Sequence, residues 1–174
     1  MNVLGLDLSL TSTGYCHGGE AGCIVTDLRG PERLRKIGRE IENIIVEKQI
    51  DIIAIEGYSF ASKNSQAHSI GELGGVVKVF LLNLEKPFIL IPPTCRAKFA
   101  TGKGNAGKAE VISSISAITG IVWKGASADD MCDVWVLEEM VLTKLEKGKH
   151  IWPKESLLSL DKVDWTPLEE MENA

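Results

Sequence analysis

Hydrophobic and polar residues alternate with a period of two near the start of the chain, which predicts β-strands. Residues 2–9 place three leucines on one face of a strand and Asp7 on the other. Two further strand-like runs follow at about 13–18 and 21–28, on either side of His-Gly-Gly-Glu. The first third of the chain is therefore predicted to form a three-stranded antiparallel meander.

Beyond Pro31 the period lengthens to that of an α-helix. The apolar residues form one stripe, at Leu34, Ile37, Ile41, Ile44 and Ile45. Residues 51–57 are then nearly all apolar, as in a central parallel strand covered on both faces, and Glu56 lies at the carboxyl end of this run. A second helix at about 66–84 leads into a strand at 87–91. Alternating strands and helices of this kind indicate parallel pairing.

The second half of the chain is predicted to be mainly helical. A short helix is expected at about 94–100, a glycine-rich loop at 101–107, a helix at 108–119 and a long helix at about 127–147. The predicted class is α/β. Its centre is a five-stranded mixed sheet of three antiparallel strands followed by parallel strands, with helices flanking it.

The composition fits one compact domain. The chain has 174 residues, of which 44% are hydrophobic and 25% are charged. We expect a domain over 1–150 and an acidic tail over 151–174, in which Trp152 and Trp165 are candidates to pack back onto the domain. No apolar run approaches the roughly 20 residues of a membrane span. Four scattered cysteines suggest idle thiols in a reducing compartment, and we expect a cytoplasmic protein without a membrane partner.

The net charge of −5 argues at first against a nucleic-acid partner. Residues 151–174, however, hold two lysines against six acidic residues, and so account for −4 of this charge. The segment between Glu85 and Glu110 contains no acidic residue and carries five basic ones: Lys86, Arg96, Lys98, Lys103 and Lys108. This segment is either a surface for phosphates or an ordinary solvated face.

Two carboxylates sit where the strand pattern predicts the sheet interior. Asp7 interrupts an apolar first strand, and Glu56 ends the strand expected to pair with it in parallel. A buried carboxylate is strongly disfavoured unless it is paired, hydrogen-bonded or bound to a metal. Two such groups side by side stay ionised only with a cation between them, and hard oxygen ligands select Mg²⁺ or Mn²⁺.

Three aspartates lie at the start of the last long helix. At 100° per residue, Asp130 falls within the stripe of Val134, Leu137 and Val141. On the same reckoning Asp133 lies at its edge and Asp129 points about 120° away from its centre. Asp130 and Asp133 are therefore expected to face Asp7 and Glu56. The alternative is a capping box at Ser127-Ala-Asp-Asp130, together with a helix-dipole preference for acidic residues.

Asp7, Glu56, Asp130 and Asp133 together supply four negative charges, enough for two divalent ions at one scissile phosphate. In such a site one ion activates a water molecule and the other stabilises the leaving oxygen. The residues therefore predict phosphodiester hydrolysis with two Mg²⁺ ions, for which Mn²⁺ would substitute.

Three segments resemble, in order and spacing, the acidic motifs of the RuvC family of Holliday junction resolvases: Gly-Leu-Asp7-Leu-Ser-Leu-Thr-Ser-Thr-Gly-Tyr15, Ile-Glu56-Gly-Tyr-Ser-Phe60 and Ala-Asp-Asp130-Met-Cys-Asp133-Val. The resemblance covers about residues 3–145. It implies an RNase H-like fold, a two-Mg²⁺ site built from these four carboxylates, and a homodimer that nicks opposing strands of a four-way DNA junction.

The resemblance also implies roles for residues around the carboxylates. Phe60 or Tyr58 corresponds to an aromatic that stacks on bases at the crossover, although packing under the next helix is the alternative. Lys108 matches a lysine beside the site, and Lys103 is a second candidate to contact phosphates. The remaining expected DNA contacts are Lys63, Arg96 and Lys98.

The chain departs from the family in its extra aspartate, Asp129, and in its acidic tail. These departures and the short length point to a bacteriophage version, with forks and flaps as further candidate substrates. Three alternatives stay open. An actin-like ATPase would use the segment after Asp7 as a phosphate-binding hairpin, a binding module would keep the fold without catalysis, and an RNA-directed nuclease would share the metal chemistry.

Overall fold

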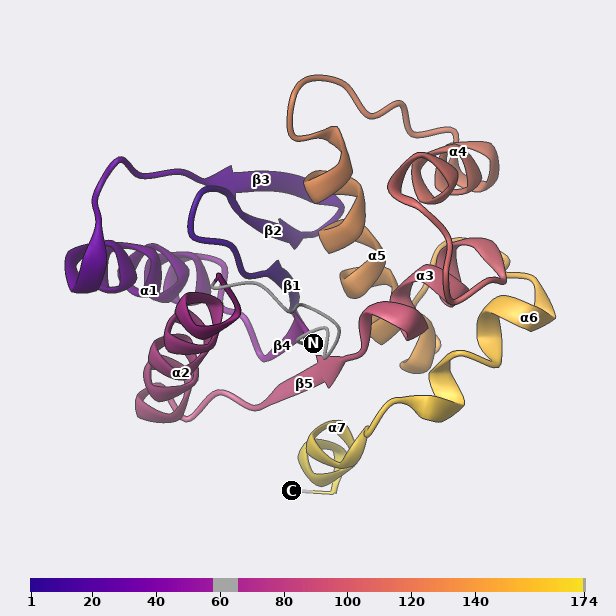
Figure 1. The fold of residues 1–174 in the computed structure, drawn as a ribbon. Helices are drawn as coiled ribbons and strands as arrows, with labels where there is room; N and C mark the ends of the chain where they lie inside the picture. Colours follow the sequence, from indigo (N-terminus) through magenta and orange to yellow (C-terminus); the bar gives the residue numbers. More distant parts are fainter. Residues whose placement is uncertain (58–65, 174) are drawn as a thin grey trace.

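A five-stranded mixed sheet separates two layers of helices in the computed structural model, which describes residues 1–57 and 66–173 (Figure 1). The strands are β1 (Val3–Asp7), β2 (Thr13–His17), β3 (Glu20–Ile24), β4 (Ile52–Glu56) and β5 (Phe88–Ile91). Their order across the sheet is β3-β2-β1-β4-β5, antiparallel among the first three strands of the chain and parallel from β1 through β4 to β5. The predicted class and strand arrangement are confirmed.

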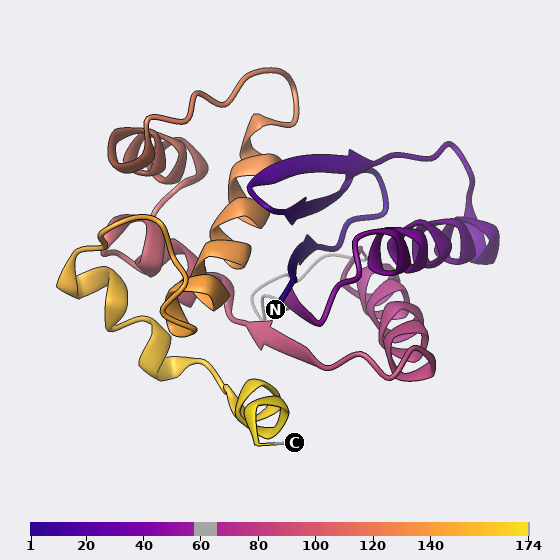
Figure 2. The ribbon, with the colours of Figure 1, turned by 180° about the vertical axis from the view of Figure 1, so that it is seen from behind.

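One face of the sheet is covered by α1 (Gly30–Glu47) and α2 (Gln66–Asn83), which lie together in both views (Figures 1 and 2). The even-numbered leucines of the first strand point to this side, as their period predicts. They pack with residues of β4 and with the apolar stripe of α1, and the large buried side chains there include Leu4, Leu6, Ile37, Ile41, Ile45, Ile53 and Ile55.

The opposite face is covered by α5 (Ala128–Lys144), with α3 (Pro93–Thr101) and α4 (Lys108–Thr119) beyond it (Figure 2). Two glycines let α5 approach the strands closely. A β-carbon at Gly5 would collide with the backbone oxygen of Val134, and one at Gly14 would lie 2.9 Å from a methyl group of the same valine. This contact fixes the first turns of α5 against β1 and β2.

Helix α5 is buried from Cys132 to Val141, so that even two glutamates of its middle turns are inaccessible. Glu138 accepts hydrogen bonds from the backbone amides of Gly18 (2.6 Å) and Gly19 (3.1 Å) and from the Cys16 thiol (3.0 Å). The two glycines have positive φ angles and form the two-residue turn between β2 and β3. The carboxylate therefore ties the helix to the hairpin. The other buried glutamate, Glu139, accepts from the Trp152 indole.

The C-terminal segment folds back along α3 and β5 as α6 (Lys154–Leu157), the 3₁₀ turn η1 (Leu160–Lys162) and α7 (Thr166–Glu172) (Figure 1). Trp152 and Trp165 are each only 6% exposed and belong to the same core as α5. The Trp165 indole donates to the backbone oxygen of Leu160 at 2.8 Å. The acidic side chains of this segment remain on its outer side, because its apolar residues supply the contacts.

Within the described part of the chain, no helix combines the length and the apolarity needed to cross a membrane.

Candidate active site

Three carboxylates from distant parts of the chain meet at one edge of the sheet. Asp7 ends β1 and Glu56 ends β4, and because Leu6 pairs with Ile55 in the parallel register, the two acids lie side by side. Asp133 reaches them from the second turn of α5. One oxygen from each of the three carboxylates lies within 4.8 Å of the others. The backbone thus brings together three of the four carboxylates that the sequence singled out.

Burial makes these three carboxylates hard to ionise. It raises the pKa of Asp7 to about 7, with a further contribution from the neighbouring Glu56 charge. Burial is also the largest cause raising the pKa of Asp133 to about 6 and the pKa of Glu56 above its usual range. Such a cluster favours a bound cation, because a positive charge removes the repulsion that keeps protons on the acids.

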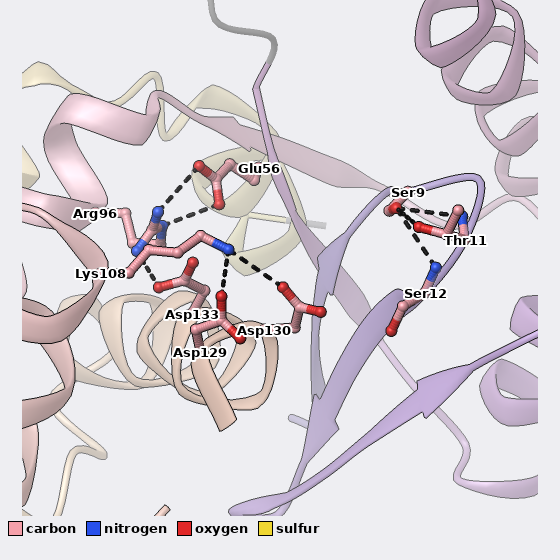
Figure 3. Close-up of polar contacts among 9 residues, drawn as sticks. All are labelled: Ser9, Thr11, Ser12, Glu56, Arg96, Lys108, Asp129, Asp130 and Asp133. Carbon is pink, nitrogen blue, oxygen red and sulfur yellow. Dashed lines mark hydrogen bonds and ion pairs between the residues drawn. The ribbon is translucent and has the colours of Figure 1, made fainter. Parts of the chain in front are cut away.

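Arg96 of α3 lies against two of the carboxylates (Figure 3). Its Nε donates to Glu56 Oε2 at 2.9 Å and its Nη2 to Glu56 Oε1 at 3.3 Å, while Nη1 pairs with Asp133 Oδ1. The sequence placed Arg96 among the DNA contacts without indicating this position. Its helix has no amphipathic period, and the position follows from how α3 crosses the end of β4 rather than from local spacing.

Lys108 lies at the mouth of the site, at the first residue of α4. Its amine is 2.5 Å from Asp129 Oδ2 and 3.5 Å from Asp130 Oδ1 (Figure 3). The hydrogen bond from this amine lowers the pKa of Asp129, and the same bond raises the pKa of Lys108. The structure thus places this lysine beside Asp129 and Asp130.

The three aspartates of α5 lie at different depths. The Asp133 side chain is 4% exposed, whereas those of Asp130 and Asp129 are 26% and 31% exposed. The phase argument put Asp130 nearest the centre of the buried stripe and Asp133 at its edge. Because every residue of α5 from Cys132 to Val141 is buried, the position of an aspartate along the helix decides its exposure more than the helix face on which it lies. Ser127 makes no side-chain capping bond, so the capping-box alternative has no support from the geometry.

The other predicted DNA contacts fall into two groups. Tyr58, Phe60 and Lys63 lie outside the described residues. Lys98 lies two residues beyond Arg96 on α3 and so projects from a different side of that helix. Lys103 precedes α4 and pairs with Glu110 in its first turn, at 2.9 Å.

The residues present suit a hard divalent cation. Every donor in the three-residue group is a carboxylate oxygen, and no histidine or cysteine belongs to it. Oxygen-only donor sets favour Mg²⁺, Mn²⁺ or Ca²⁺ over the softer metals. Asp7, Glu56 and Asp133 would supply the innermost ligands, and Asp130 lies at the mouth, where its Oδ1 is 3.5 Å from the Lys108 amine.

The backbone amides of the turn after Asp7 are not free to bind a phosphate. The backbone amides of Thr11 and Ser12 donate to Ser9 Oγ at 3.3 and 3.4 Å (Figure 3). The amide of Ser9 itself donates to Thr13 Oγ1 at 3.1 Å. These donors are therefore already used within the turn, which disfavours the reading of this segment as an ATP-binding hairpin.

The chain is similar to known proteins over most of its length. The family model described as "Crossover junction endodeoxyribonuclease RuvC" matches residues 3–135. The RuvC protein of Alkaliphilus oremlandii is 28% identical over 144 residues, which cover 76% of this chain and 87% of that protein. A Thermus thermophilus RuvC structure aligns with a TM-score of 0.67 at 20% identity, covering 87% of this chain and 100% of the other. The structure of T. thermophilus RuvC in complex with a Holliday junction substrate aligns with a TM-score of 0.65 at 21% identity, over 87% and 99% of the two chains. The predicted RNase H-like fold is thereby confirmed.

Proposed function

The chain belongs to the RuvC family of crossover junction endodeoxyribonucleases, and we propose that it cuts branched DNA, above all four-way junctions, by metal-dependent phosphodiester hydrolysis. The observation that carries this proposal is the convergence of Asp7, Glu56 and Asp133, with ligand atoms within 4.8 Å of one another. The name of the matching family and the Holliday junction substrate in the T. thermophilus complex support DNA junctions as the target.

We propose that two divalent ions bind here, with Mg²⁺ as the natural metal and Mn²⁺ as a substitute. Asp7, Glu56, Asp130 and Asp133 would hold them, and their four charges match those of two divalent ions. When bound, such a pair supplies an activated water and stabilisation of the leaving 3′ oxygen. The burial of the three inner carboxylates keeps bulk water away from them and strengthens their attraction for a cation.

Lys108 is proposed to contact the DNA phosphate at the mouth of the site. Its side chain is 61% exposed, and its amine contacts the Asp129 and Asp130 carboxylates beside the inner group of Asp7, Glu56 and Asp133. A lysine there balances the negative charge that the phosphate brings. Lys98 and Lys103, with the aromatic residues Tyr58 and Phe60, remain proposed DNA contacts, as does Lys63.

Substrate choice is tested by matched labelled molecules: a four-way junction, a fork, a linear duplex and an RNA–DNA hybrid, each with Mg²⁺, with Mn²⁺ or with EDTA. We expect the junction to be nicked fastest, the fork more slowly, and nothing to be cut in EDTA. Cleavage of the hybrid alone would replace junction resolution with an RNA-directed activity and leave the metal chemistry intact. Hydrolysis of ATP without DNA cleavage would overturn both.

We propose that two copies of the chain pair through α2. One face of this helix carries exposed Val79 and Leu82, which are 55% and 68% accessible, and aligned with them are Gly71 and Gly75, where an added β-carbon would meet nothing within 4 Å. A smooth apolar face of this kind suits close contact with an identical helix. A dimer would place two sites on one junction, as paired incision requires.

Leu82→Glu should convert the protein from dimer to monomer in sedimentation experiments, because it buries a charge in the proposed contact. Val46→Glu serves as the matched control, since it adds the same charge at an exposed apolar position of α1. Nicking of one strand should survive in the monomer while coordinated incision of both strands is lost. A wild-type protein that sediments as a monomer with and without junction DNA would contradict the dimer.

The setting is proposed to be the cytoplasm of a bacterial host, with the chain as a bacteriophage form of the family. DNA junctions occur in that compartment, and the four cysteines are all unpaired. The extra Asp129 and the acidic C-terminal segment are the features that support the bacteriophage origin. Detection of the coding sequence within a phage genome would test it, and a chromosomal setting without phage genes would contradict it.

A further inference from the structure

Arg96 occupies the centre of the carboxylate cluster rather than its rim. Its side chain is 11% exposed, and the two carboxylates it contacts are 12% and 4% exposed. The guanidinium engages both oxygens of Glu56 and one oxygen of Asp133 (Figure 3). These are two of the three groups whose ligand atoms converge. The arginine therefore binds two of the three carboxylates that a metal ion would need.

The two cations of the site are held differently. Lys108 is 61% exposed and contacts two carboxylates at the mouth through a single amine. The guanidinium of Arg96 is planar and makes a forked contact with Glu56 in a nearly buried place. A divalent ion bound to the same oxygens would be strongly repelled by a guanidinium that stayed there, because screening inside the site is weak. Metal and arginine thus compete for Glu56 and Asp133.

We propose that Arg96 is an internal counter-cation, which holds Glu56 and Asp133 in place before metal binds and exchanges them for a phosphate oxygen of DNA when metal enters. This inference rests on the proposed metal-dependent nuclease function. Arg96 is then a positioning residue in the metal-free protein and a phosphate contact in the loaded complex.

One consequence is that metal and DNA help each other to bind. The metal displaces Arg96 from the carboxylates, which leaves the guanidinium without an anionic partner. A DNA phosphate then becomes the new partner of Arg96. By linkage, DNA must raise metal affinity by the same factor by which metal raises DNA affinity. The protein would then hold metal weakly until a substrate is present, which limits cleavage to the DNA-bound state.

Metal affinity in the absence of DNA tests the competition directly. Calorimetric titration with Mn²⁺ at pH 8 should show Arg96→Gln binding about tenfold more tightly than wild type, because the competing charge is gone. Arg96→Lys should fall between them, since an amine cannot fork across both oxygens of Glu56. Arg35→Gln is the matched control on the exposed surface of α1, and its affinity should equal that of wild type.

The outcomes separate this inference from the proposed function. Equal Mn²⁺ affinity in wild type and Arg96→Gln, within about a factor of two, overturns the role of Arg96 while leaving the metal site standing. No binding by any of the proteins overturns the metal site itself, and the inference falls with it. Circular dichroism spectra of the variants verify that they are folded.

A second measurement needs only the wild-type protein, in case the variants do not fold. The Nε–H group of Arg96 should give an NMR signal protected from solvent exchange in EDTA, because it donates to buried Glu56. Saturating Mg²⁺ should remove that protection. Protection that persists at saturating Mg²⁺ means that the guanidinium does not leave the carboxylates, and the exchange is excluded.

Discussion

Asp133→Asn should lower the rate of Mg²⁺-dependent junction cleavage by about a thousandfold or more, while Asp129→Asn should retain most of it. Asp133 is 4% exposed, and its carboxylate oxygen lies within 4.8 Å of ligand atoms of Asp7 and Glu56. Asp129 is 31% exposed, does not belong to that group and pairs with Lys108. Removing one charge from the inner group weakens the metal ligation on which the chemistry depends.

The two aspartates make a well-matched comparison, because the same substitution is made at positions four residues apart on one helix, and each side chain contacts a cation. Asparagine keeps an oxygen that can still accept a bond from Arg96, so the fold should survive in Asp133→Asn. Single-turnover rates on a labelled four-way junction measure both variants. Equal losses would mean that Asp129 is also a ligand and that the assignment along α5 is wrong.

In EDTA, the free energy of unfolding should fall as the pH rises from about 5 to 8, by a few kcal/mol in all. The pKa of Asp7 is raised to about 7 and that of Asp133 to about 6, both because of burial first. A raised carboxyl pKa means that the folded state binds the proton more tightly than the unfolded chain. The resulting stability is fully present below the ordinary pKa and is lost as the pH passes through 6 to 7.

Urea denaturation at pH 5.5 and pH 8, in EDTA or in Mg²⁺, measures this dependence. Mg²⁺ should restore stability at pH 8, because it binds the folded state and neutralises the cluster. Asp7→Asn should be more stable than wild type at pH 8 in EDTA and should gain less from Mg²⁺. Asp27→Asn, at an exposed position before α1, is the control and should leave both values unchanged. If Asp7→Asn is less stable than wild type at pH 8 in EDTA, the ionised Asp7 carboxylate is not what lowers the free energy of unfolding at high pH.

The positions of Asp7 and Glu56 could be predicted from the sequence because strand periodicity is local. Alternating residues place Asp7 opposite the leucines, and an apolar run ending in Glu56 is typical of a central parallel strand. Parallel pairing of these two strands then brings the two acids together, since both acids end strands that are neighbours in the sheet.

The ranking of the α5 aspartates could not be predicted in the same way. A helical-phase argument assumes one buried face, but α5 is enclosed by the sheet and by α3 and α4, and its residues from Cys132 to Val141 are all buried. Adjacent Glu138 and Glu139 would suggest a solvated face. They are buried because the hairpin amides and the Trp152 indole, far away in sequence, supply their hydrogen bonds.

The position of Arg96 against Glu56 and Asp133 could not be predicted from the sequence either. Its basic neighbours made it one member of a charged segment, and nothing in the spacing of Pro93–Thr101 distinguishes it from Lys98. Only the crossing of α3 over the end of β4 brings it to Glu56. Contacts of this kind depend on tertiary packing, which local periodicity does not encode.

The central claim is that Asp7, Glu56 and Asp133 hold the catalytic metal, and anomalous diffraction at the manganese edge tests it most directly. Crystals of the protein with junction DNA and Mn²⁺ should show a peak bonded to oxygens of all three carboxylates, at about 2.0–2.3 Å, as expected for Mn²⁺ ligated by oxygen. Absence of a peak there, with Mn²⁺ bound elsewhere on the protein or not at all, would contradict the account.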